Sequence, residues 1–201
     1  HGIAACREGI DRVHIVNGKV DEALLSEVFL NEGIGTMIYA NQYQSIRGAM
    51  KKDVQSIQNL IKRAVQSQEI LPRTRAMILQ QLNNYYVFEV DRNVLGCVAL
   101  HPDTGSRAAE VACLYVSPSH ENQGIGRRLL AYVEKVAREA GIDSLFALST
   151  QTYAFFEQKG GFSPASPDIL PGKRREQWEK SGRNSRILTK DLKNQPATIP
   201  V

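Results

Sequence analysis

The chain has 201 residues, which is enough for one domain of ordinary size and a fragment of a second. Hydrophobic residues make up 42% of it and charged residues 23%, so a collagen-like, coiled-coil or wholly disordered chain is excluded. The longest apolar run, Val94 to Leu100, is far too short to span a bilayer. The net charge of +4 suits anionic small molecules but does not by itself indicate nucleic acid.

The cysteines and histidines indicate neither a disulfide framework nor a metal site. Cys6, Cys97 and Cys113 are an odd number without Cys-x-x-Cys or Cys/His spacing, and the four histidines are scattered. We expect reduced, buried thiols in the cytoplasm, or in a plastid stroma if the source is a plant. The chain begins at His1 without a leader, so we expect it to be part of a longer or processed polypeptide.

The first 40 residues carry a few short elements that cannot bury a core of their own. Hydrophobic spacing and turn residues predict a strand at Val13 to Val16, a turn at Asn17-Gly18, a helix at Asp21 to Phe29, a loop at Asn31 to Gly35 and a strand at Thr36 to Ala40. The apolar residues of the helix form one face. We therefore expect this segment to pack against other parts of a polypeptide.

From about residue 41 to residue 193 the predicted order is strand, helices, three strands, helix, strand, helix and strand. The predicted helices are Lys51 to Val65, Pro72 to Leu82, Gly124 to Ala140 and Thr152 to Lys159. The clearest predicted strands are Tyr85 to Val90, Val94 to Leu100, Ala109 to Val116, Ser144 to Leu148 and Arg186 to Leu188. This order favours an α+β domain, followed by a frayed tail at residues 194–201.

The sharpest local signal is the turn Glu121-Asn122-Gln123-Gly124-Ile125-Gly126-Arg127-Arg128, between a strand and an amphipathic helix. Two glycines allow close backbone approach, and the amides and dipole at a helix start attract anions such as a pyrophosphate. A plain tight turn is the alternative interpretation. The spacing matches neither a P-loop nor the three-glycine dinucleotide fingerprint.

Residues 111–130, VACLYVSPSHENQGIGRRLL, resemble the acetyl-CoA binding motif of the GCN5-related N-acetyltransferases, except that Glu121 stands where Arg or Gln is usual. The resemblance implies an α+β fold with a mixed, mostly antiparallel sheet flanked by helices. It also implies acetyl-CoA as cosubstrate and no metal. By this resemblance the cofactor-binding residues are Leu114, Tyr115, Val116, Gln123, Gly124, Ile125, Gly126, Arg127 and Arg128.

Further stretches resemble one branch, the N-acetylglutamate synthases. They are Ala147 to Thr150, Phe155-Phe156, Gly161-Phe162, Leu170-Pro171, Arg174-Arg175 and Arg183 to Arg186. Residues 10–38, ending in LLSEVFLNEGIGTMI, resemble the last part of the α/β amino-acid-kinase-like domain that precedes the acetyltransferase domain in that branch. The resemblance implies residues 1–40 as a remnant of that domain and 41–193 as the acetyltransferase domain. It implies acetylation of the α-amino group of L-glutamate, the first step of arginine biosynthesis, in a homo-oligomer with arginine as an effector.

Acetyl transfer from a thioester to an amine needs a proton acceptor and a group that stabilises the leaving thiolate. Glu110 is the candidate base, with a solvated strand residue as the alternative. Ser149 is the candidate partner of the departing sulfur, with a helix N-cap as the alternative. Because Phe156 stands where many members of the fold have a tyrosine acid, Tyr153 is a further candidate.

A dicarboxylate acceptor needs two anion sites, and guanidinium groups suit carboxylates. The resemblance implies that Arg47, Cys113 through its backbone, Arg183 and Ser185 bind glutamate. Arg174 and Arg175 are either surface charges or a basic rim of the cleft. Strand Cys113 to Val116 is expected to splay at a bulge, exposing amides to acetyl-CoA.

Two other functions stay open on the sequence. One keeps the fold but acetylates another amine, and the other is a CoA-binding regulatory module without turnover. Acetylation assays with glutamate and a panel of amines separate the first from glutamate acetylation, and CoA binding without transfer identifies the second. Neither a nucleic acid nor a membrane is expected as a partner.

Overall fold

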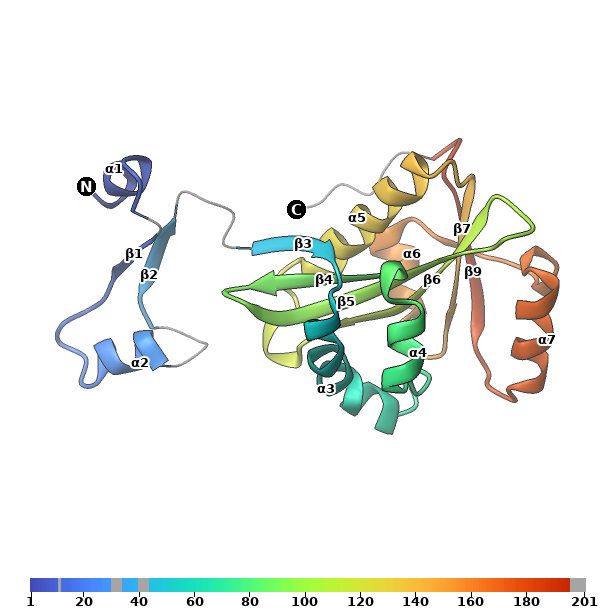
Figure 1. Ribbon diagram of the computed structural model, residues 1–201, viewed down its shortest axis with the longest axis horizontal. Helices are drawn as coiled ribbons and strands as arrows, with labels where there is room; N and C mark the ends of the chain where they lie inside the picture. Colours follow the sequence, from blue (N-terminus) through green and yellow to red (C-terminus); the bar gives the residue numbers. More distant parts are fainter. Residues whose placement is uncertain (11, 30–33, 40–43, 196–201) are drawn as a thin grey trace. The chain divides into compact units, whose positions relative to one another are not determined.

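The computed structural model describes residues 1–10, 12–29, 34–39 and 44–195, which form two compact units, His1–Ser45 (unit 1) and Ile46–Val201 (unit 2) (Figure 1). The residues around the expected boundary at 40/41, part of the predicted loop Asn31 to Gly35 and most of the tail lie outside these ranges. Within them, every helix is too short or too polar to span a lipid bilayer.

Unit 1 contains a two-stranded antiparallel sheet and two short helices. Its elements are α1 (Gly2–Arg7), β1 (Arg12–Ile15), α2 (Ala23–Phe29) and β2 (Thr36–Tyr39). Helix α1 was not predicted, because six residues carry too little periodicity to indicate a helix. Helix α2 begins two residues later than predicted, because Glu22 has a φ of 57°, in the left-handed region.

The apolar face of α2 is largely open to solvent. Ala23 is buried, but Leu24, Leu25, Val28 and Phe29 are exposed. Exposure of four large apolar side chains on one short helix is unusual on the solvent-exposed surface of a complete protein. The helix face that we expect to pack against other parts of a polypeptide is therefore exposed in this structure.

Unit 2 is built on a seven-stranded sheet with the order β3-β4-β5-β6-β7-β9-β8. Its strands are β3 (Gln44–Gly48), β4 (Tyr85–Val90), β5 (Asn93–Pro102), β6 (Ala108–Val116), β7 (Ser144–Ser149), β8 (Ser163–Pro164) and β9 (Arg186–Asp191). Its helices are α3 (Val54–Gln66), α4 (Arg75–Gln80), α5 (Ile125–Glu139), α6 (Tyr153–Gly160) and α7 (Gly172–Lys180). Among β4 to β9 the pairings are antiparallel apart from β6 with β7, which confirms the predicted mixed sheet.

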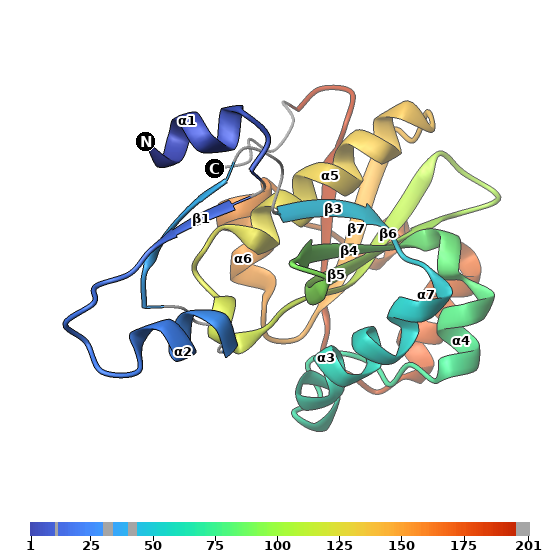
Figure 2. The ribbon, with the colours of Figure 1, turned by 60° about the vertical axis from the view of Figure 1, so that its left-hand side comes forward.

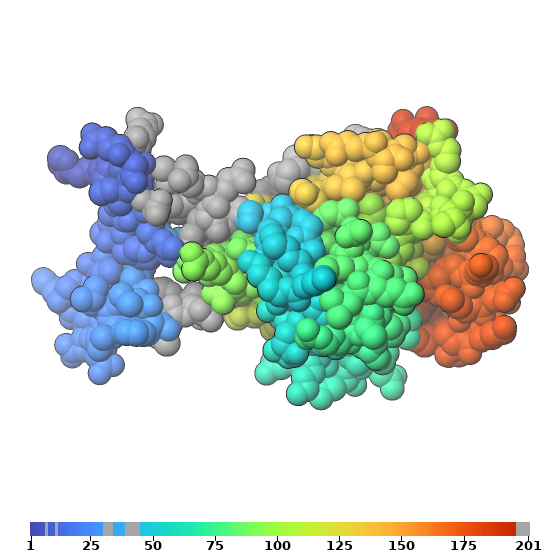
Figure 3. Space-filling model, in the orientation of Figure 1, coloured from blue at the N-terminus to red at the C-terminus, as the bar shows by residue number. Residues whose placement is uncertain are grey.

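Helices cover both faces of this sheet, as the strand patterns require. On β4, Tyr85 and Val87 join the apolar cluster under α3 and α4, whereas Phe88 joins the cluster under α5 and α6. Figures 1 and 2 show the two pairs of helices on opposite sides of the sheet. In the space-filling view the atoms of α3 and α4 lie together over one face of unit 2 (Figure 3).

Strand β6 parts from β7 after Glu110 but stays paired with β5 as far as Val116. Its parallel pairing with β7 runs from Ala108 to Glu110, and the register with β5 shifts opposite Cys113. Cys113 has a φ of 54°, which is rare for a residue with a side chain and is typical of a bulge. The predicted splay at a bulge is therefore present.

In unit 2 several predicted boundaries move, and one helix, α7, was missed. Pro72 precedes α4 rather than opening it, because Thr74 caps the helix by accepting a hydrogen bond from the backbone nitrogen of Met77 at 3.2 Å. Helix α7 lies in the segment that the sequence marks only as basic. Its residues are polar, with Trp178 as the main apolar contact, so no stripe indicates a helix.

Candidate active site

The expected phosphate-binding turn lines a cavity of about 770 Å³ beside the end of β6 and the start of α5. Gly124 is the N-cap residue of α5 and has a φ of 76°, a conformation that glycine adopts without strain. A Cβ atom on Gly126 would lie 3.2 Å from the ring of Phe155, so this position has little room for a side chain. Both glycines therefore allow the backbone to lie against the cavity.

Eight of the nine predicted cofactor-binding residues line this cavity: Leu114, Tyr115, Val116, Gln123, Gly124, Ile125, Gly126 and Arg127. The ninth, Arg128, does not line it, and its guanidinium group lies 4.8 Å from the centre of the Phe88 ring. Because successive helical residues point in directions about 100° apart, only one of two neighbouring arginines can face the cavity.

A second cavity, of about 490 Å³, adjoins the first and is lined by predicted catalytic and substrate-binding residues. Both cavities are lined by Glu69, Leu114 and Thr152. Five predicted residues from strands β6 and β7 and from the loop before β9 line the second cavity: Glu110, Cys113, Ser149, Arg183 and Ser185. The fold thus brings together residues that lie up to 75 positions apart in the chain.

Glu110, on β6, is held by an arginine from α7. The Nε and Nη2 atoms of Arg174 donate to Glu110 Oε2 and Oε1 at 2.6 and 2.8 Å. The side chain of Glu110 is only 13% exposed, so this is not the solvated strand residue of the alternative interpretation. Such a two-point contact fixes the plane of the carboxylate group. Arg174 is thus not a plain surface charge, and it lines the second cavity.

Ser149 lies at the end of β7 and is buried. Its hydroxyl oxygen is 3.0 Å from the hydroxyl oxygen of Thr152, which is itself the N-cap residue of α6. The N-cap interpretation of Ser149 is therefore wrong. Tyr153 lines neither cavity, and Arg186 lies over its ring at 3.7 Å, so this tyrosine is not placed to donate a proton.

The three cysteines are free and buried, as predicted. Cys97 donates from its sulfur to the backbone oxygen of Cys113 at 3.4 Å. The side-chain contact with Cys113 and burial together raise the pKa of the Cys97 thiol, which keeps it protonated. Cys113 borders the second cavity through a strand whose backbone is distorted at that residue.

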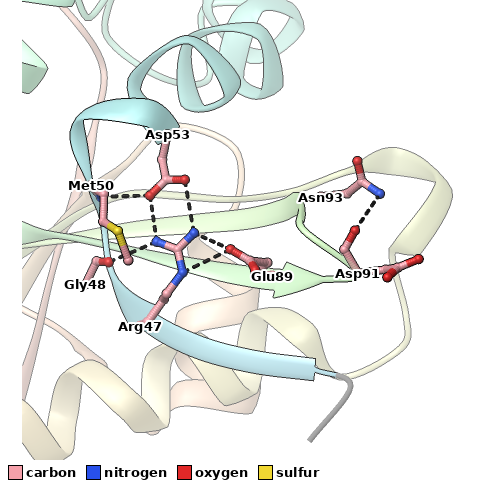
Figure 4. Close-up of polar contacts among 7 residues, drawn as sticks. All are labelled: Arg47, Gly48, Met50, Asp53, Glu89, Asp91 and Asn93. Atoms are coloured by element: carbon pink, nitrogen blue, oxygen red, sulfur yellow. Dashed lines mark hydrogen bonds and ion pairs between the residues drawn. The ribbon is translucent and has the colours of Figure 1, made fainter. Parts of the chain in front are cut away.

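Arg47 is not part of this site, contrary to the prediction. Its guanidinium group donates to Asp53 Oδ2 at 2.6 Å and Oδ1 at 3.0 Å, and to Glu89 at 2.9 Å from Nε (Figure 4). Hydrogen bonding to Asp53 raises the pKa of Arg47 above its ordinary value. Arg47 lies on β3, and two carboxylates of unit 2 already bind it, so it has a structural role.

Arg73, which was not among the predicted site residues, lines the second cavity together with Arg174 and Arg183. It lies in the loop before α4, and its Nε atom is buried without a hydrogen-bond partner among the described residues. Arg183 donates to the backbone oxygens of Gln68 and Glu69, the latter at 3.4 Å, so it joins the loop before β9 to the end of α3. The only signal for Arg73 in the sequence is its place beside Pro72.

Among the described residues, no group of three or more His, Cys, Asp or Glu side chains is arranged to hold a metal ion.

The comparisons with known proteins agree with this geometry. Residues 52–162 match the model of the acetyltransferase (GNAT) family. This match covers more than half of the chain and includes the glycine turn and Glu110. The chain therefore belongs to the GNAT acetyltransferase family.

Relatives within this family are known. An amino-acid acetyltransferase of Neisseria meningitidis is 40% identical over 190 residues, which are 94% of this chain and 43% of that protein. A crystal structure of N-acetylglutamate synthase from Neisseria gonorrhoeae complexed with coenzyme A and N-acetyl-glutamate is 40% identical, with a TM-score of 0.73, over 95% of this chain and 45% of that one.

The same synthase complexed with coenzyme A and L-arginine is 39% identical, with a TM-score of 0.83, over 95% of this chain and 43% of that chain. This chain thus spans less than half the length of the relatives that it matches. The similarity extends beyond the family model into unit 1.

Proposed function

We propose that this chain is the acetyltransferase part of an N-acetylglutamate synthase. It transfers the acetyl group of acetyl-CoA to the α-amino group of L-glutamate. The observation that carries the proposal is the pair of adjoining cavities. One is lined by the glycine turn, and the other combines Glu110 with Arg73 and Arg183. Besides Arg174, which is paired with Glu110, the second cavity thus offers two guanidinium groups to an amine that carries two carboxylates, with Glu110 as the base.

In this reaction the Glu110 carboxylate accepts the proton that the amine loses, directly or through water. Arg174 keeps the carboxylate plane fixed from α7. The amine then attacks the thioester carbonyl near the distorted backbone of Cys113, whose splayed strand leaves amides for the developing oxyanion. The Ser149 hydroxyl, at the junction near Thr152, stabilises the departing sulfur.

The first cavity takes the CoA part. The amides of the turn from Gln123 to Gly126 and the positive end of α5 receive the pyrophosphate, with Arg127 as the side-chain cation. Glu121 lines the same cavity and repels phosphate, so the backbone carries more of the contact. Leu114, Tyr115 and Val116 on β6 border the path of the pantetheine arm.

Unit 1 is, in this proposal, the last part of the amino-acid-kinase-like domain of a longer synthase. The exposed apolar face of α2 supports this assignment, because that face needs a partner to bury it. In the whole protein we propose a homo-oligomer, a place in the cytoplasm or in a plastid stroma, and arginine as an effector. Titration of arginine into the whole protein by calorimetry tests the last point, and an absence of binding removes it.

Release of free thiol from acetyl-CoA with L-glutamate tests the function. We expect glutamate-dependent release by the wild-type chain and weaker glutamate saturation for Arg183→Ala. Tight CoA binding without release would instead support the regulatory module, and release with another amine but not with glutamate would support a different acetyltransferase.

A further inference from the structure

His101 is a residue of the second cavity to which the proposed reaction gives no role. It lies on β5 directly opposite Glu110 of β6 in the antiparallel register, and both side chains line the cavity. Opposite residues on neighbouring strands have side chains on the same face of the sheet, with Cβ atoms about 5 Å apart. His101 therefore borders the space in which the acyl acceptor would bind.

The hydrogen bonds of the imidazole ring define which nitrogen carries its proton. The side-chain amide nitrogen of Asn84 lies 3.3 Å from His101 Nδ1, and an amide nitrogen can only donate. Nδ1 therefore accepts, and the neutral ring carries its proton on Nε2. The Nε2 atom is buried and has no hydrogen-bond partner among the described residues.

The ring is held in place and kept neutral. Tyr85 packs edge-to-face against it, with ring centres 5.9 Å apart at an angle of 80°. Burial lowers the pKa of His101, and the charges of Arg73 and Arg174 lower it further, whereas Glu110 acts in the opposite direction. His101 thus presents one fixed, uncharged N–H donor.

A second buried donor of the same cavity also lacks a partner. The Nε atom of Arg73 is buried and unpaired among the described residues, and Arg73 is close enough to affect the pKa of His101. Glu110 does not take up the His101 donor, since its contacts within hydrogen-bond distance are with Arg174. Both residues line the second cavity, and their two buried N–H groups lack a partner among the described residues. Such groups call for an acceptor, which a ligand can supply, and a carboxylate has lone pairs for both.

We propose that His101 is a specificity-determining residue, whose Nε2–H donates a hydrogen bond to a carboxylate of the acyl acceptor in the part of the cavity bordered by Arg73. The proposal rests on the proposed function for the identity of that acceptor. The arginines of the cavity attract any anion. The neutral N–H donor of His101 adds selectivity, because it favours an acceptor whose carboxylate lies at the right position.

Three substitutions separate the donor from the rest of the ring. In His101→Gln the amide nitrogen of glutamine reaches about as far as Nε2. In His101→Asn the amide nitrogen of asparagine reaches only as far as Nδ1. In His101→Phe the ring of phenylalanine fills the space of the imidazole but has no hydrogen-bond donor. We expect the KM for L-glutamate to stay within about threefold in His101→Gln and to rise about tenfold or more in the other two. The KM for acetyl-CoA and kcat should change less than about threefold.

Comparison with L-glutamine and L-glutamate as acceptors identifies the carboxylate. If His101 contacts the side-chain carboxylate, the loss in His101→Phe is smaller for glutamine than for glutamate. If it contacts the α-carboxylate, the loss is similar for both. Calorimetric CoA binding by each variant checks that the domain is folded.

An unchanged KM for glutamate in His101→Phe would overturn the proposal. A fall in kcat at unchanged KM would also overturn it, because His101 would then act through the base Glu110 and not in binding the acceptor. A second experiment, by proton NMR, does not depend on turnover. In the CoA-bound wild-type protein, N-acetyl-L-glutamate should shift the Nε2–H proton resonance of His101 to lower field. No shift on a saturated complex would also overturn it, whereas a wild-type protein without glutamate acetylation refutes only the proposed function.

Discussion

Arg174 donates two hydrogen bonds to Glu110, through Nε at 2.6 Å and Nη2 at 2.8 Å, and so connects helix α7 to strand β6. The two residues are 64 positions apart, and α7 reaches Glu110 because its Trp178 packs against Phe146 of β7 and Ile187 of β9. The orientation of the candidate base therefore depends on α7, which also lines the cavity with Gln177 and Trp178.

The first prediction concerns this contact. Arg174→Lys should lower kcat about tenfold, because an ammonium group is a point charge that cannot hold the carboxylate plane. Arg175→Lys is the matched control, since Arg175 is exposed and pairs with Asp168 and Glu179. Steady-state rates with glutamate and acetyl-CoA measure both. Equal rates for the two variants would show that Arg174 does not orient the base.

Glu110→Gln should lower kcat by about 10² to 10⁴, because the amide keeps the shape of the side chain but accepts no proton. Acetyl-CoA binding, measured by calorimetry, should stay at the wild-type level, since Glu110 does not line the first cavity. A kcat within threefold of the wild type would remove Glu110 from the reaction.

Arg47 and Arg183 should behave differently when each is changed to alanine. Arg47→Ala should lower the free energy of unfolding by about 1 to 3 kcal/mol, because the buried carboxylate of Asp53 loses its partner, and should leave the KM for glutamate unchanged. Arg183→Ala should raise that KM about tenfold or more. Denaturant unfolding and initial rates distinguish the two; the reverse pattern would restore Arg47 to the site.

From the conformation of the glycine turn we predict an effect on the KM for acetyl-CoA but not on the KM for glutamate. Gly124→Ala should raise the KM for acetyl-CoA several-fold, because alanine at a φ of 76° costs about 1 kcal/mol and shifts the turn. Gly172→Ala is the control, since that glycine opens α7 and an added methyl group there would meet no atom within 4 Å. Equal KM values for both variants would contradict a role of the turn conformation.

The pKa of His101 predicts a pH dependence of stability. Its pKa in the folded protein lies below the ordinary 6.5, through burial and the charge of Arg73, so the unfolded chain binds the proton more strongly. Stability should therefore fall as the pH drops below about 6.5 and level off below the folded pKa. The difference in unfolding free energy between wild type and His101→Gln should change in favour of the variant between pH 7.5 and 5.5; a constant difference would contradict the shift.

Much of the fold could be predicted from the sequence, because apolar residues recur at regular spacing in its main strands and helices. Alternation on strand Tyr85–Val90 and the apolar stripe of Ile125–Glu139 indicate a sheet with helices on both faces. Helix Gly172–Lys180 could not be predicted, because it is polar on nearly all sides and relies on Trp178.

The position of a residue on a strand predicts the side of the sheet on which its side chain lies. It does not predict which other residue that side chain binds. Glu110 and Ser149 follow from the strands that carry them. Arg47 lies on a strand too, but the sequence does not show that Asp53, six residues later, turns back to bind it. Arg73 was missed because a loop residue beside a proline carries no period, and only the folded chain shows that it faces the cavity.

The most direct test is a competition experiment in which the chain receives acetyl-CoA and an equimolar mixture of glutamate, glutamine, aspartate, alanine and lysine. Mass spectrometry then identifies the acetylated products and the nitrogen that carries the acetyl group. Arg73 and Arg183 in one cavity with the carboxylate of Glu110 predict acetylglutamate, modified at the α-nitrogen, as the dominant product. A mixture led by acetyl-lysine or acetyl-alanine, or acetyl-CoA left intact while CoA binds tightly, would contradict this account.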